Sequence, residues 1–117
     1  MHHYLQDLRS LDMHCMLAKR LRANPGLLPR LKAQFEHWDS LPHGSQMKAE
    51  YRQAWLTAID GGVDAVHALV TEESDRGQVL RSCSPFGVLW ASPGERLAFM
   101  RDWTTKHAQM RVPTGPW

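Results

Sequence analysis

The sequence predicts an all-α fold, a compact bundle of about five to six helices in a single domain. Apolar residues recur at spacings of three and four over most of the chain, which is typical of amphipathic helices. No alternating segment exceeds four residues, and Asp60-Gly61 lies between two helical patterns instead of two strands. The 117 residues, of which 43% are hydrophobic and 22% charged, suit one globular core.

The first expected helix runs from about His3 to Arg22. Asn24-Pro25 then predicts a stop and a new start, because Asn is a favourable N-cap and Pro is tolerated at the first helical position. Pro29 shifts the expected start of this second helix toward Gly26 or Leu28. We expect the two helices to lie antiparallel. The first presents the stripe Tyr4, Leu8, Leu11, Cys15 and Ala18 beside Met13, Leu17 and Leu21, and the second presents Leu27, Leu28, Leu31, Phe35 and Trp38.

The middle of the chain predicts a loop followed by two helices. Pro, Gly and Ser occur in quick succession between Asp39 and Ser45, and Ser45 can cap a third helix that ends at Gly61-Gly62. A short fourth helix is expected from about Val63 to Val70. The apolar face of the third helix comprises Met47, Tyr51, Ala54, Trp55, Ala58 and Ile59.

A short fifth helix is expected to follow, with Thr71 to Asp75 in its first turn and with Val79 and Leu80 facing inward. The acids of this first turn are favourable to the helix dipole. Gly77 should weaken the helix by about 1 kcal/mol relative to Ala.

The stretch from Ser82 to Arg96 is an apolar connection between helices. Pro85 prevents the preceding residue from continuing a helix, and Gly87 permits a turn. Ser92 and Glu95 then form a capping box with Pro93 at the first helical position. The sixth helix is expected from Pro93 to about His107, where it should bury some of Leu97, Phe99, Met100 and Trp103. Residues 1–110 would form the helical domain, and residues 111–117 a flexible tail.

Composition limits the class of protein. The net charge of +2 argues against a protein that mainly coats nucleic acid. Cys15 and Cys83 are far apart in the sequence and read as thiols of a reducing compartment. No apolar run approaches the ~20 residues that a membrane-spanning helix needs. We therefore expect a cytoplasmic protein with no membrane partner.

One pattern suggests catalysis. Arg9 and His14, with four residues between them, could supply the guanidinium and imidazole of a metal-independent ribonuclease. This spacing resembles the Arg-x4-6-His motif of helical nucleases of the HEPN superfamily. Residues five apart are about 140° apart around a helix, so a partner would have to complete the site. Arg101 and His107 repeat the pattern, and chance accounts for such spacings in a chain with seven histidines.

The sequence predicts neither a metal site nor a cofactor. His2-His3, and His37 with His43, lack the spacing of zinc ligands, and no Cys-x2-Cys pair occurs. Gly61-Gly62 is explained as a helix stop, not as a phosphate-binding loop.

Two groups of residues could contact a partner. A basic patch comprises Lys19, Arg20, Arg22, Arg30 and Lys32. It would suit an acidic protein surface more than nucleic acid, because no interleaved aromatic residues accompany it. The second group comprises Pro85, Phe86, Leu89, Trp90 and Arg96. Aromatic and Arg side chains are typical interface anchors, although the same segment could instead cover the core.

The chain resembles a group of short uncharacterised bacterial proteins between about Leu8 and Trp103. The matching runs are Leu8 to His14, Leu21 to Leu28, Phe35 to Trp38, Arg81 to Leu89, and Ser92 to Arg96. In that group the later motifs read Leu-Arg-x-Ser-Ser-Pro-Phe-Ala-Gly-x-Leu and Ser-Pro-x-Glu-Arg. This chain departs from them in having Cys83 for a Ser and no Ala between Phe86 and Gly87.

The resemblance implies a function because members of that group accompany toxin or nucleotidyltransferase-like genes. It predicts a non-enzymatic, antitoxin-like subunit that binds and restrains such a protein. A helical ribonuclease and a DNA-binding autoregulator are the alternatives. The sequence leaves open whether the chain forms a homodimer.

Overall fold

The computed structural model describes residues 4–44 and 46–107. These residues form six α-helices and two short 3-10 helices, with no strand among them. The helices are α1 (Tyr4–Ala23), η1 (Pro25–Leu27), α2 (Leu28–Ser40), α3 (Ala49–Gly61), α4 (Val63–Val70), α5 (Asp75–Ser82), η2 (Phe86–Leu89) and α6 (Pro93–Lys106). The predicted all-α bundle is thereby confirmed. The expected tail at 111–117 lies outside the described residues.

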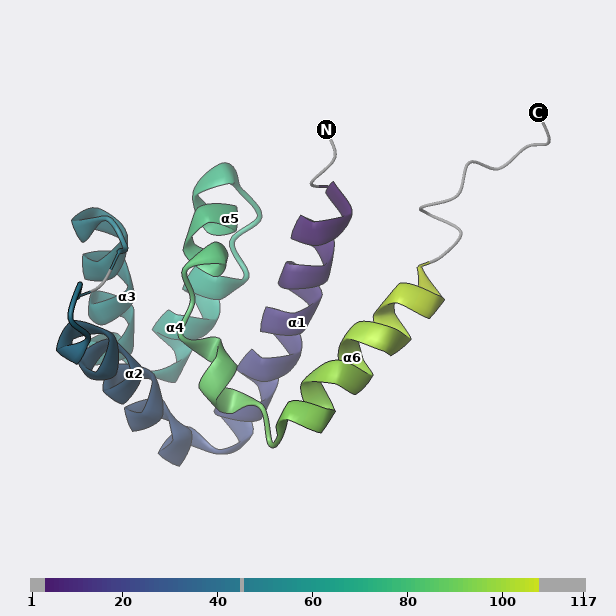
Figure 1. Cartoon of the computed structure of the whole chain (residues 1–117), viewed down its shortest axis with the longest axis horizontal. Coiled ribbons are helices and arrows are strands. Elements are labelled where there is room, and N and C mark those ends of the chain that lie inside the picture. Colours follow the sequence, from purple (N-terminus) through teal and green to yellow (C-terminus); the bar gives the residue numbers. More distant parts are fainter. Residues whose placement is uncertain (1–3, 45, 108–117) are drawn as a thin grey trace.

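The first helix buries part of each expected stripe together with His14, which neither stripe contained. Its inward stripe is His14, Leu17, Ala18 and Leu21, whereas Tyr4 is 67% exposed. The buried residues of α1 begin half-way along it, at His14, and α4, α5 and η2 are among the elements that contact this helix (Figure 1).

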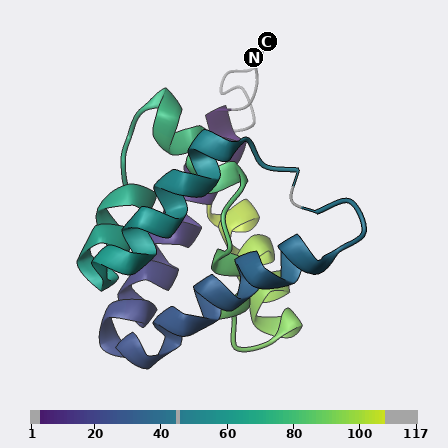
Figure 2. The ribbon, with the colours of Figure 1, turned by 90° about the vertical axis from the view of Figure 1, so that its left-hand side faces the viewer.

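The first two helices are not an antiparallel pair. They diverge from the corner at η1, and η2 contacts both of them (Figures 1 and 2). Asn24 stands at the N-cap position of η1 but makes no side-chain capping bond. The α-helix starts at Leu28, as Pro29 suggests, and Leu31 and Phe35 are its buried residues.

The next three helices follow the expected order with corrected starts. The helix α3 has Lys48 as its N-cap, so Ser45 is not its cap, and Ser45 itself lies outside the described residues. Gly62, at φ 102, ends α3 and admits the start of α4. In α5 Leu80 is buried, but Val79 is 37% exposed.

Gly77 is needed where it stands. It is buried in the first turn of α5, and a Cβ atom on it would lie 2.0 Å from the carbonyl oxygen of Glu72. The amide of Gly77 donates to Ser74 Oγ at 3.0 Å, which makes Ser74 the N-cap of this helix. Glycine lowers the helix propensity at this position, but a residue with a Cβ atom would collide with the backbone of Glu72.

The core fills the space enclosed by α1 to α5 and η2. Its largest fully buried side chains include Trp55, Phe35 and Phe86. Trp55 Nε1 donates to the carbonyl oxygen of Leu80 at 3.0 Å, so the indole joins α3 to α5 and satisfies its own polar group. By contrast α6 leaves this body, and Trp103 is its one buried residue among those described (Figure 1).

Candidate functional site

The segment from Pro85 to Leu89 lies inside the protein. Phe86 is 1% exposed, Leu89 is 3% exposed and Pro85 is fully buried. The ring of Phe86 stacks on His14 with centroids 5.1 Å apart and also contacts Trp55. These three expected interface residues therefore belong to the core, because η2 fills the gap between α1 and α2.

The other two expected interface residues are less enclosed. Arg96 is exposed, and Trp90 is half-buried. The indole of Trp90 contacts the ring of Phe99, with centroids 5.7 Å apart. The second half of the expected interface thus continues onto α6.

The start of α6 is attached to α1 by one arginine. Arg20 binds both carboxylate oxygens of Glu95 and donates from Nη1 to the carbonyl oxygen of Leu89 at 2.9 Å. Glu95 also accepts from the amide of Ala91 at 2.7 Å, and Ser92 Oγ accepts from the amide of Glu95 at 3.1 Å. The predicted Ser92 cap is confirmed, although the Glu95 carboxylate reaches Ala91 and not the amide of Ser92 that a capping box uses.

These contacts favour the ionised form of the Glu95 carboxyl group. Hydrogen bonding from Arg20, and then from the Ala91 amide, lowers the pKa of Glu95 to about 2. The carboxylate therefore stays ionised well below neutral pH and keeps α6 attached.

A second attachment lies near the far end of α6. Trp103 Nε1 donates to Asp12 Oδ2 at 2.8 Å, and the indole stacks on His107 with centroids 3.9 Å apart. Between the two attachments is a hollow of about 490 Å³, which we call the α1–α6 groove. It is lined by Asp12, Cys15, Met16, Lys19, Phe99, Asp102, Trp103 and Lys106.

The α1–α6 groove combines an apolar floor with charges of both signs. Met16 and Phe99 are partly buried there, whereas Lys19 and Asp102 are exposed at its edges. Leu97 on the same helix is 63% exposed. A surface of this kind suits a polypeptide partner more than a small ligand.

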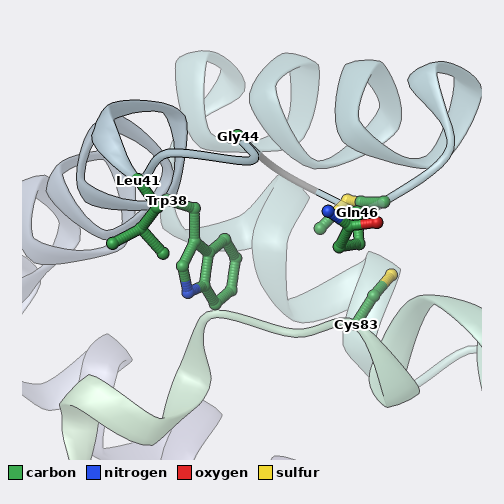
Figure 3. A pocket seen from close by; sticks show the side chains of 6 residues that line it. Trp38, Leu41, Gly44, Gln46 and Cys83 are labelled. Carbon is green, nitrogen blue, oxygen red and sulfur yellow. The ribbon is translucent and has the colours of Figure 1, made fainter.

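A second hollow is almost wholly apolar. It has a volume of about 390 Å³ and is lined by Trp38, Leu41, Gly44, Gln46, Met47 and Cys83 (Figure 3). Burial raises the pKa of the Cys83 thiol, whose sulfur donates to the carbonyl oxygens of Val79 and Leu80. A neutral, hydrogen-bonded thiol is a poor nucleophile, so nothing about Cys83 indicates covalent chemistry.

The geometry is unfavourable for catalysis by Arg9 and His14. His14 is 1% exposed, and its Nδ1 donates to the carbonyl oxygen of Ser10 at 2.7 Å. Desolvation lowers its pKa to about 4, so it is neutral at physiological pH. An imidazole enclosed by the core cannot reach an RNA strand.

The pair at Arg101 and His107 is also unsuited to act on RNA. Arg101 is exposed, and its Nε lies 3.7 Å from Oδ1 of Asp102. The imidazole of His107 is stacked on Trp103, and its Nδ1 lies 3.0 Å from the carbonyl oxygen of that residue. The two side chains have separate partners and form no common site.

The basic patch is divided by internal pairing. Arg20 belongs to the attachment of α6, and Arg22 lies 3.0 Å from Asp64. Lys19, Arg30 and Lys32 are exposed. The five residues are therefore not one free cationic surface.

The described residues contain no group of three or more His, Cys, Asp or Glu side chains arranged to hold a metal ion. Within the same part of the chain, no helix has the length and apolar content required to cross a bilayer. Comparisons with protein-family models, curated proteins and solved structures find no match to this chain.

Sequence reasoning missed the α1–α6 groove. The sequence pattern does contain Met16 and Phe99, but it cannot show that Asp12 and Trp103, 91 residues apart, would be joined. The unusual number of tryptophans, five in 117 residues, is the one signal that could have drawn attention to Trp103.

Proposed function

We propose that this chain is a non-enzymatic interaction subunit that binds and restrains a partner protein, as an antitoxin does. The observation that carries the proposal is the exposure of Leu97, at 63%, on a helix that stands away from the core beside the α1–α6 groove. A contact site needs more exposed apolar surface than one side chain provides. Phe99, which contacts Trp90 and lines the groove, lies on the same helix as Leu97. The resemblance to proteins that accompany toxin or nucleotidyltransferase-like genes supports the same function.

The contact surface is Trp90, Leu97, Phe99 and the α1–α6 groove. This surface omits Pro85, Phe86 and Leu89, the buried residues of the interface expected from the sequence, and retains Trp90. Exposed Lys19, Lys106 and Asp102 line the groove and favour a partner that carries charges of both signs around an apolar contact.

The burial and contacts of the candidate catalytic residues favour an interaction role over nuclease activity. His14 is neutral and enclosed, and the guanidinium of Arg101 is separated from an imidazole that is itself stacked on Trp103. Arg20 and Arg22 pair with Glu95 and Asp64 of the same chain, which reduces the cationic surface available to DNA.

Co-expression with the product of the adjacent gene tests the proposal. We expect the two proteins to co-elute in size-exclusion chromatography and the chain to relieve growth inhibition caused by its partner. Separate elution together with no rescue of growth would contradict the proposal. Cleavage of RNA by the purified chain without metal would instead favour the ribonuclease alternative.

A further inference from the structure

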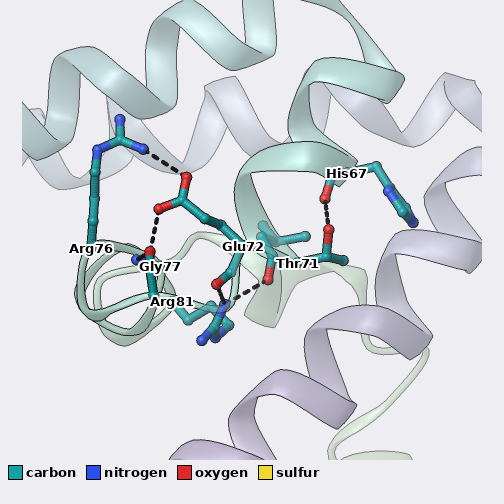
Figure 4. A network of polar contacts seen from close by, with 8 residues as sticks. His67, Thr71, Glu72, Arg76, Gly77 and Arg81 are labelled. Atoms are coloured by element: carbon teal, nitrogen blue, oxygen red, sulfur yellow. Dashed lines mark hydrogen bonds and ion pairs between the residues drawn. The ribbon is translucent and has the colours of Figure 1, made fainter.

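Among the described residues, Arg81 is the one buried side chain that carries a permanent charge, with 5% of its surface exposed. Its Nη1 donates to the carbonyl oxygens of Val70 at 3.0 Å and Glu72 at 2.7 Å. These carbonyls lie where α4 has ended and lack helical partners. Figure 4 shows that both bonds come from one side of the guanidinium, which is thereby fixed in position.

The charge of Arg81 is not balanced by a direct ion pair. Its Nε is buried without a hydrogen-bond partner, and none of the ion pairs found in the described residues includes it. Burial of a cation without a directly paired anion is unfavourable, because the hydration that the ion loses is not replaced. This arrangement is therefore suited to an anion that comes from outside the chain.

A hollow of about 340 Å³ between α1 and α5 leads to Arg81. We call it the α1–α5 hollow. Leu8 and Leu11 of α1 line it and are half-buried, whereas Glu73 and Asp75 are exposed at its edge. It thus presents a cation at depth, apolar walls and carboxylates toward solvent.

The geometry points to a binding site for a small zwitterion with an apolar side chain, that is, a free aliphatic α-amino acid. Its carboxylate would pair with Arg81, its ammonium group would face Asp7 and Glu73, and its side chain would lie on Leu8 and Leu11. A simple anion would be repelled by the carboxylates of Asp7, Glu73 and Asp75, and a simple cation would leave Arg81 unpaired. A zwitterion satisfies both, and the volume falls within the range of about 300–1,000 Å³ that is usual for small-molecule sites.

The charges on the two sides of the hollow already influence each other. Burial lowers the pKa of the Arg81 guanidinium, whereas Cys15 and the carboxylates of Asp7 and Glu73 act in the opposite direction. Asp7, Glu73 and Arg81 line the same hollow, so one small ligand in it would face all three side chains. This site goes beyond the interaction function, and either could hold without the other.

Titration of the isotope-labelled full chain with L-leucine tests the site. We expect saturable amide shifts at Leu8, Leu11 and Gln78 and a rise in melting temperature with L-leucine concentration. 4-Methylpentanoate lacks the ammonium group and 3-methylbutylamine lacks the carboxylate. Each should bind about tenfold more weakly or worse, because a charge-assisted hydrogen bond is lost.

Arg81 anchors the turn after α4, so its replacement could unfold the chain. Glu73→Lys is the better variant because Glu73 is exposed, and it should weaken L-leucine binding by about tenfold through the reversed charge. Glu50→Lys, at an exposed position of α3, should leave binding unchanged. The proposal is overturned by absence of saturable shifts at millimolar L-leucine, by equal binding of 4-methylpentanoate, or by equal effects of the two lysine variants.

Discussion

Arg20 of α1 binds Glu95 of α6 through both terminal nitrogens of its guanidinium, across 75 positions of sequence. The same guanidinium holds the carbonyl oxygen of Leu89, the last residue of η2. One side chain therefore fixes the start of α6 relative to the core. Because Trp103 is the only described residue of α6 that is buried, this attachment controls how the helix is presented to a partner.

Glu95→Gln should loosen α6 without unfolding the body. The variant keeps an oxygen for the Ala91 amide but loses the ionic contact with Arg20, so amide hydrogen exchange should accelerate within α6. Glu50→Gln removes a first-turn carboxylate from α3 and is the matched control for the helix dipole. Equal exchange rates of α6 in the two variants would show that the Arg20 contact is unimportant.

The same contact should weaken in strong acid. The folded-state pKa of Glu95 lies below its ordinary value of 4.5, at about 2. Its stabilising contribution is therefore complete above pH 4.5 and is lost as the pH falls toward 2. Exchange of α6 amides should then approach that of Glu95→Gln.

His14 should make the protein less stable in mild acid. Its pKa is lowered from 6.5 to about 4, so the unfolded chain binds a proton more readily than the folded chain between these values. The free energy of unfolding should fall by about 3 kcal/mol as the pH drops from 6.5 to 4, at 1.36 kcal/mol for each pH unit. Urea unfolding of wild type and His14→Gln should show this fall only in the wild type.

His37→Gln is the control for that measurement because His37 is exposed near the end of α2. It should retain the slope of the wild type between pH 6.5 and 4. A slope that survives in His14→Gln would assign the acid sensitivity to other groups.

Gly77→Ala should destabilise the fold by about 1–3 kcal/mol, the range for overpacking. The new Cβ would lie 2.0 Å from a backbone oxygen, which cannot move as a flexible side chain can. Gly94→Ala is the matched change in the first turn of α6, where the nearest atom would be 3.7 Å away. It should be neutral or stabilising by about 0.4–1 kcal/mol. Thermal unfolding distinguishes the two variants, and equal effects would contradict the close approach at Gly77.

Phe86→Ala should cost about 3–5 kcal/mol of unfolding free energy, as expected for a fully enclosed aromatic ring. Trp90→Ala should cost less because Trp90 is half-buried. Denaturant unfolding monitored by circular dichroism measures both. A larger loss of unfolding free energy in Trp90→Ala than in Phe86→Ala would contradict the conclusion that η2 fills the gap between α1 and α2.

Local chemistry made much of the fold predictable. The Gly61-Gly62 stop, the span of α4 from Val63 to Val70 and the Ser92 cap all depend on neighbouring residues, and all are found. Contacts distant in sequence were not accessible in this way. Two neighbouring stripes were expected on α1, and neither contained His14. The buried face combines residues of both stripes with His14, and it depends on the elements that pack against α1.

The candidate site was predicted in part for the same reason. Arg96 is exposed and Trp90 is half-buried, but Pro85, Phe86 and Leu89 are enclosed by elements that the sequence pattern could not place. A segment of apolar residues between helices looks the same whether it covers a core or meets a partner. Likewise, the basic character of Arg20 gives no indication that Glu95 would neutralise it.

The affinity of Leu97→Ser for the co-eluting partner tests the proposed interaction most directly. Loss of a buried Leu contact should weaken binding at least about tenfold, since full burial of such a side chain is worth about 1.5–3 kcal/mol. Val79→Ser is the matched control because Val79 is 37% exposed on α5, outside the proposed surface. It should change the affinity by less than about threefold. Unchanged binding by Leu97→Ser, or an equal loss in both variants, would contradict the proposal.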